Sequence, residues 1–309
     1  MPLCQVNIVA GGIEAPHAAE AAVRTASSGL SPDTPAIILI HGYKYSPTLA
    51  AHDPHRQILS LDPRPSWKSV SWPRRLGLGA GPGPEPLCVA LGWNARGTLW
   101  QASTRAAETG AALAELVRLL NDLRPGAPVQ ILAHSLGARV ALSALPHLSA
   151  GSVARLILLA AAELRSGAER WLECPAGRAV EVMNVTSREN ALFDVLLEWL
   201  LAPHHVGDRA LGAGLGRALP RWLDLWVDDP ATRTALAGLG YEVPAPNRRI
   251  CHWSVYLRSG LFDLYRAILN DRLSLAEVRA ALPQRPARRP RLIGARASLP
   301  LPMLRRGAS

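Results

Sequence analysis

A turn from a strand into a helix is indicated by the segment Val129-Gln130-Ile131-Leu132-Ala133-His134-Ser135-Leu136-Gly137-Ala138-Arg139-Val140. An apolar run of strand length, residues 129–132, leads through Ala-His-Ser-Leu-Gly into helix formers over residues 138–148. A serine on such a turn projects its hydroxyl from a strained backbone, and small residues two positions to either side let the strand and the helix approach. The pattern therefore indicates that Ser135 is a nucleophile, with a serine that only caps the helix as the alternative.

Strand-like and helix-like segments alternate on both sides of this turn. We expect buried strands at residues 6–10, 36–40, 67–72, 154–160 and 179–185. An amphipathic helix begins near Thr104 and carries leucines on one face at positions 113, 116, 119 and 120. This alternation predicts the α/β class, with a mainly parallel central sheet flanked by helices.

The last third of the chain has a different composition. Residues 191–249 are rich in Leu and Trp and read as helical without a strand, so we expect one domain over residues 1–283 with a helical cap or insertion at about 196–247. Residues 284–309 hold seven Arg and no acid, which indicates an extended basic tail. The formal net charge of the whole chain is +10, so residues 1–283 carry only +3. Since no aromatic residues interleave this charge, we expect no specific nucleic-acid partner.

Other signals point to a protein without metal, cofactor or membrane span. Cys4, Cys88, Cys174 and Cys251 form no close pair, and they are interpreted as free thiols. The pair His204 and His205, with Asp208 nearby, lacks further ligands and is interpreted as polar surface. No apolar run has the length of a membrane span and no signal segment opens the chain, so we expect a cytoplasmic protein.

A second loop near the nucleophile is indicated by His41-Gly42-Tyr43, which directly follows the run at residues 36–40. Gly42 lets the backbone turn closely, so that the amides of Tyr43 and Leu136 can stabilise an oxyanion. A glycine turn with a structural His41 is the alternative interpretation.

Together these motifs resemble the α/β-hydrolase superfamily. The resemblance covers residues 37–148, where His41-Gly42-Tyr43, Ser71-Trp72-Pro73 and Ala133-His134-Ser135-Leu136-Gly137 stand in the order of the family. Trp93-Asn94-Ala95-Arg96-Gly97 is similar to uncharacterised bacterial esterase- and lipase-like hydrolases. The resemblance implies the α/β-hydrolase fold and the hydrolysis of an ester, thioester or amide, although inactive members of the fold exist.

The resemblance also implies the chain order nucleophile, acid, histidine. Glu189 lies four residues past the strand at 179–185, and Asp194 lies nine past it; we favour Glu189 and leave Asp194 open. Asn190 fits a loop one residue longer, but an amide orients an imidazolium less well. His252 is the expected base, because it comes late in the chain and precedes a helix-like segment.

The sequence thus predicts a serine hydrolase that cleaves a carboxylic ester of a small acyl compound through an acyl-enzyme. Ser135 is the expected nucleophile, His252 the base and Glu189 the acid, with Tyr43 and Leu136 as the oxyanion hole. A catalytically inactive binding or scaffold protein of the same fold is the second hypothesis. The sequence carries no signal for the oligomeric state.

Overall fold

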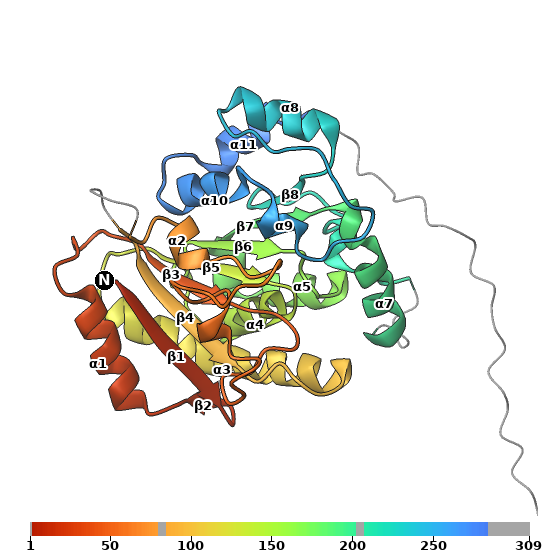
Figure 1. Ribbon diagram of the computed structural model, residues 1–309. Helices are drawn as coiled ribbons and strands as arrows, with labels where there is room; N and C mark the ends of the chain where they lie inside the picture. Colours follow the sequence, from red (N-terminus) through yellow and green to blue (C-terminus); the bar gives the residue numbers. More distant parts are fainter. Residues whose placement is uncertain (1, 80–84, 202–206, 284–309) are drawn as a thin grey trace, which may run out of the picture.

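The computed structural model describes residues 2–79, 85–201 and 207–283, and these form one eight-stranded sheet with helices on both faces (Figure 1). The strands are β1 Leu3–Val9, β2 Gly12–Ile13, β3 Ala36–Ile40, β4 Leu87–Trp93, β5 Val129–His134, β6 Arg155–Leu159, β7 Glu181–Thr186 and β8 Trp222–Trp226. The α-helices are α1 Pro16–Ser27, α2 Trp72–Arg75, α3 Leu99–Leu123, α4 Leu136–Ala144, α5 Arg165–Leu172, α6 Pro175–Ala179, α7 Ala191–Leu201, α8 Pro230–Gly238, α9 Ser254–Leu257, α10 Leu261–Leu269 and α11 Leu275–Ala281.

The strand order across the sheet is β2-β1-β4-β3-β5-β6-β7-β8. The short β2 pairs antiparallel with β1, and the remaining neighbours in the described sheet are parallel. Because β4 pairs with one side of β3 and β5 with the other, the chain changes direction across the sheet at this point. Ligands of open α/β sheets bind at the carboxyl ends of the strands beside such a point. The expected α/β class with a mainly parallel sheet is confirmed.

Two apolar layers enclose the sheet, one on each face. The strand β3 has apolar residues at every position because it contacts both layers. Ala36, Ile38 and Ile40 belong to the core on the side of α1, α3 and α4. Ile37 and Leu39 belong to the core on the side of α2, α8, α10 and α11, which Figure 1 shows above the sheet. A strand that is covered on both faces needs apolar residues at every position.

Two of our strand expectations were wrong. Residues 67–72 form no strand; Ser71 instead caps α2, its hydroxyl accepting a 3.2 Å hydrogen bond from the Arg74 amide. The strand in this part of the chain is β4, all seven residues of which are buried. The stretch from 191 to 249, which we expected to lack a strand, contributes β8 to the edge of the sheet.

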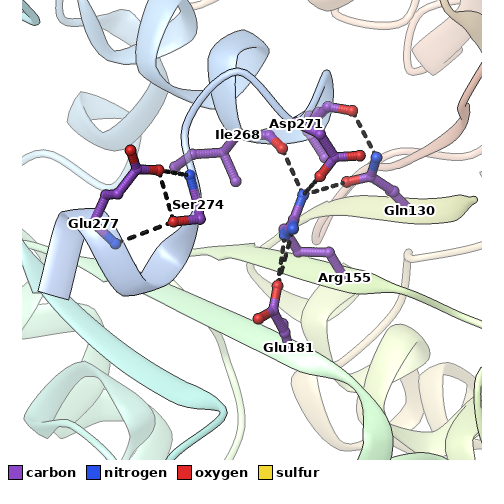
Figure 2. A network of polar contacts seen from close by, with 8 residues as sticks. Gln130, Arg155, Glu181, Ile268, Asp271, Ser274 and Glu277 are labelled. Atoms are coloured by element: carbon purple, nitrogen blue, oxygen red, sulfur yellow. Dashed lines mark hydrogen bonds and ion pairs between the residues drawn. The ribbon is translucent and has the colours of Figure 1, made fainter.

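The amino ends of the strands are closed by a polar network around Arg155, the first residue of β6 (Figure 2). Its guanidinium donates to Glu181 at 2.9 Å, to Asp271 at 3.0 Å and to the Ile268 carbonyl at 2.5 Å. Gln130 accepts from it at 3.2 Å and donates to the Leu269 carbonyl at 2.6 Å. The network joins the end of α10 to the amino ends of β5, β6 and β7, so this edge of the sheet has a structural role.

Some expectations fall on residues outside the described part of the chain. The basic tail, residues 284–309, lies there, and so do His204 and His205. Within residues 2–79, 85–201 and 207–283, no helix has the length and apolar character that crossing a membrane requires.

Candidate active site

Ser135 stands on a strained turn between β5 and α4. Its backbone has φ 55° and ψ −123°, a region that residues with a side chain rarely adopt. Two backbone hydrogen bonds hold the turn, from the Ser135 amide to the Leu159 carbonyl at 2.9 Å and from the Ala162 amide to the Ser135 carbonyl at 3.0 Å. The Ser135 side chain makes no capping hydrogen bond to α4, so the alternative of a simple helix cap has no support.

Two glycines let this turn approach the segment that follows β3. A Cβ on Gly137 would lie 2.7 Å from the His41 carbonyl oxygen and 2.8 Å from that of Ile40. A Cβ on Gly42 would lie 2.6 Å from the Cβ of Ser135. All three distances are shorter than the contacts that real Cβ atoms make, so only glycine fits at these positions and the Gly42 backbone lies against Ser135.

His41 anchors this second loop. Its Nδ1–H donates to the Gly42 carbonyl at 2.9 Å, and its Nε2 accepts from the Trp93 amide at 3.1 Å. Complete burial lowers the pKa of His41 to about 3, so the ring is neutral. Both ring nitrogens are therefore occupied, which matches the structural interpretation of His41. The amides of Tyr43 and Leu136 donate no hydrogen bond to another described residue.

His252 lies between Asn190 and His134. Its Nδ1 is 2.6 Å from Oδ1 of Asn190; since that oxygen only accepts, Nδ1 carries the proton and Nε2 keeps a free lone pair. His134, the residue before Ser135, donates from Nε2 to the His252 carbonyl at 3.2 Å, and the two ring centroids are 4.6 Å apart. Within the described residues the Ser135 hydroxyl makes no hydrogen bond with His252; in ligand-free enzymes this bond is often long.

The carboxylate that we expected at His252 lies elsewhere. Glu189 accepts from the Arg258 guanidinium and, at 3.2 Å, from the Ser187 hydroxyl. Residues 188–190 form a 3-10 turn, in which successive side chains point in directions about 120° apart. The turn aims Asn190 at His252 and Glu189 at the end of α9. Glu189, which we favoured over Asp194, therefore makes no hydrogen bond with His252. The neighbour of the imidazole is Asn190, the residue that fits a loop one position longer.

The backbone explains why these two loops meet. The Cys251 amide donates to the Glu189 carbonyl at 2.9 Å, which ties the segment before His252 to the loop after β7. Asp194, on the first turn of α7, does not contact the imidazole; its Oδ1 accepts from Nδ2 of Asn190 at 2.8 Å. Burial, reinforced by Glu198, raises the pKa of Asp194 to about 7.

Aromatic rings surround the imidazole. The centroid of Phe193 lies 4.7 Å from that of His252, and the centroid of Trp253 lies 5.9 Å away. Burial lowers the pKa of His252 well below its usual value, with a smaller contribution from His134. Burial also lowers the pKa of His134 to about 4, so both rings are neutral at pH 7. Sequence reasoning had not assigned Phe193 or His134 to the site; each adjoins a residue that it had.

Among the described residues, no metal-ligating cluster lies at the site, and two surface hollows lie away from it. No group of three or more His, Cys, Asp or Glu able to hold a metal occurs among residues 2–79, 85–201 and 207–283. Two surface hollows of about 450 and 440 Å³ both include Pro220 and Arg221, and neither is lined by Ser135 or His252. The Arg155 network is likewise separate from the site: it lies at the amino ends of the strands, whereas the Ser135 turn follows the carboxyl end of β5.

A strained serine between a parallel strand and a helix, beside a glycine loop from the neighbouring strand, defines a protein of the α/β-hydrolase class. Residues 27–163 match the family described as "Alpha/beta hydrolase of unknown function (DUF900)". The match covers the nucleophile turn and the Gly42 loop, and spans somewhat less than half of the chain. The chain belongs to the α/β-hydrolase superfamily.

Solved structures give weaker likenesses. A Trichoderma reesei cutinase in complex with a phosphonate inhibitor is 13% identical over 45% of this chain and 60% of its own, with a TM-score of 0.24. A Legionella pneumophila phospholipase is 16% identical over 53% of this chain and 40% of its own, with a TM-score of 0.31. A Rhodococcus sp. esterase is 12% identical over 64% of this chain and 83% of its own, with a TM-score of 0.32.

This chain covers less than two thirds of the length of the cutinase and of the phospholipase. No curated protein matches the sequence.

Proposed function

We propose that the protein is a serine hydrolase that cleaves a carboxylic ester through an acyl-enzyme. The superfamily assignment supports hydrolase activity in general, and the Ser135 turn is the observation that carries the ester proposal. The Ser135 hydroxyl attacks the acyl carbonyl while its proton moves to Nε2 of His252. The alcohol then leaves with that proton, and water attacks the acyl-enzyme by the same route in reverse.

The contacts of the site support the remaining roles that we propose. The Asn190 oxygen accepts from Nδ1–H of His252 in both protonation states, and so it holds the tautomer in which Nε2 is the base. The amides of Tyr43 and Leu136, which donate to no described residue, stabilise the oxyanion. These roles require no metal and no organic cofactor. The rings of Phe193 and Trp253 beside the imidazole favour an apolar acyl or alcohol group.

We further propose that residues 1–283 make up a single hydrolase domain. The described part of the segment that we had expected to be a helical cap, about 196–247, supplies β8 to the sheet together with α8. It therefore contributes to the body of the domain.

The test is covalent labelling of the full-length chain with a fluorophosphonate, followed by mapping of the modified peptide. We expect labelling at Ser135, and loss of both labelling and p-nitrophenyl acetate hydrolysis in Ser135→Ala. The His252→Ala variant should fold but label far more slowly, because the hydroxyl then has no base. Esterase activity that persists in Ser135→Ala would remove Ser135 as the nucleophile.

A second candidate is a non-catalytic binding protein of the same fold. It is favoured by one observation, the amide of Asn190 where the family order places a carboxylate. The labelling experiment separates the two, since a binding protein without an activated serine would leave the probe unreacted.

A further inference from the structure

Asp194 stands directly behind the amide that contacts His252. Its Oδ1 accepts from Nδ2 of Asn190 at 2.8 Å, while Oδ1 of Asn190 is 2.6 Å from Nδ1 of His252. We propose that Asp194 is a positioning residue whose carboxylate holds the Asn190 amide in the orientation that leaves Nε2 of His252 free to accept the Ser135 proton. The inference rests on the proposed function of this site and extends it by one residue.

The two ends of the Asn190 amide have opposite hydrogen-bonding requirements, because the NH2 group donates and the oxygen accepts. In the observed orientation, the NH2 group faces a carboxylate and the oxygen faces an N–H, so both contacts are favourable. A flipped amide would turn its oxygen toward the Asp194 carboxylate, where two acceptors repel. It would also turn NH2 toward Nδ1, which would then have to accept, and the His252 proton would move to Nε2. That tautomer cannot take a proton from Ser135.

The surroundings of Asp194 make this contact firm and confine the carboxylate. Gly212 lies against the carboxylate at a place where a Cβ would overlap it, so the backbone of that segment closes one side. The charged groups that face Asp194 are Glu198, from its own helix α7, and Arg209, from the segment before Gly212. Arg209 forms a 2.8 Å ion pair with Glu198, which leaves the carboxylate of Asp194 to the Asn190 amide.

A pH dependence follows from the same geometry. Burial and Glu198 raise the pKa of Asp194 to about 7, against the opposing effects of the Asn190 hydrogen bond and Arg209. A protonated Asp194 can donate to the amide oxygen, so both orientations of Asn190 become possible. Since the pKa of His252 itself is well below its usual value, kcat/KM should rise through about pH 7 with the ionisation of Asp194.

Three variants of the full-length chain test the proposal with p-nitrophenyl acetate. Asp194→Asn removes the group that selects the orientation. The double variant Asn190→Asp with Asp194→Asn exchanges the two groups, so that a carboxylate at position 190 faces His252 and an amide at position 194 lies behind it. Asp228→Asn is the control, because Asp228 is a buried carboxylate that accepts two hydrogen bonds from Arg188 and has no contact with Asn190.

We expect Asp194→Asn to lower kcat by about 10- to 100-fold, the factor that a lost charged hydrogen bond supplies, with KM unchanged. The exchange should restore most of kcat, and the control should keep it. Wild-type kcat in Asp194→Asn, or an exchange variant as slow as Asp194→Asn, would overturn the proposal.

A spectroscopic measurement keeps the test independent of variant folding and of activity. In protein labelled with 15N-histidine, the ring shifts should report the Nδ1–H tautomer of His252 at about pH 8 and a mixture of tautomers at about pH 6. The exchange variant should keep the Nδ1–H tautomer at both values. A single, unchanged tautomer in wild type would refute the role of Asp194 even if Ser135 labels normally. An unlabelled Ser135 with the expected tautomer shift would instead refute the proposed function alone.

Discussion

The buried ion pair of Glu189 and Arg258 should contribute to the stability of the fold and not to catalysis. Both side chains are nearly inaccessible, with 4% and 7% of their surface exposed, and a second guanidinium nitrogen donates to the Val227 carbonyl at 2.9 Å. Glu189→Gln removes the charge but keeps an acceptor for the guanidinium. Breaking a buried ion pair by removing one partner costs about 3–5 kcal/mol, and because an acceptor remains we expect about 3 kcal/mol.

This loss is measurable as a shift in thermal unfolding. For a domain of this size, 1 kcal/mol corresponds to about 2–4 °C, so Tm should fall by about 6–12 °C. At a temperature where both proteins are folded, kcat for p-nitrophenyl acetate should stay within a few-fold of wild type, because Glu189 has no hydrogen bond to His252. The double variant Glu189→Leu with Arg258→Met should recover much of the stability, since apolar replacements of both partners leave no unpaired charge.

The opposite pattern would refute this reasoning. If Glu189→Gln keeps its Tm but loses two or more orders of magnitude in kcat, Glu189 orients the imidazole during turnover and the ion pair with Arg258 is incidental. Asn190→Ala is the matched comparison on the same turn. It should lower kcat strongly with a smaller effect on Tm, because it removes the acceptor of the His252 proton.

Three further predictions concern single positions. Ser135→Gly should raise the free energy of unfolding by about 1 kcal/mol while abolishing hydrolysis, because glycine relieves the positive φ; a lowered Tm would contradict the strain argument. Gly42→Ala should reduce kcat/KM by more than about 100-fold, since its Cβ meets Ser135, whereas Gly12→Ala, with open space around it, should match wild type in the same assay. Arg155→Met should cost about 2–3 kcal/mol in urea unfolding and leave kcat unchanged; an altered kcat would show that the amino edge of the sheet communicates with the site.

Local sequence was sufficient where neighbouring residues determine the structure. The apolar run of β5, the serine and the small residues at 133 and 137 are close in sequence, so their pattern alone predicts the strained turn that the structure contains. The fully apolar β3 likewise predicts burial on both faces of a parallel sheet. The resemblance that these motifs carry was confirmed at the level of the superfamily.

Sequence reasoning failed where a local signal competed with tertiary context. Residues 67–72 look strand-like, yet Ser71 and Pro73 begin a helix there, and the all-apolar run of β4 was the stronger signal. β8 is only five residues long and lies among Leu- and Trp-rich helices, so its periodicity is ambiguous. Only its pairing with β7 in the folded sheet makes it a strand.

The polar partner of His252 was decided by the tertiary structure alone. Glu189 and Asn190 are neighbours, and a shift of one residue on a 3-10 turn rotates a side chain by about a third of a circle. Which of them meets the imidazole depends on Cys251, whose amide joins a segment about sixty positions away to this turn, and on Arg258, which draws the carboxylate aside. The sequence therefore predicted the loop after β7 as the neighbour of His252 but predicted a carboxylate there, whereas the packing of distant segments placed the Asn190 amide at the imidazole with Asp194 behind it.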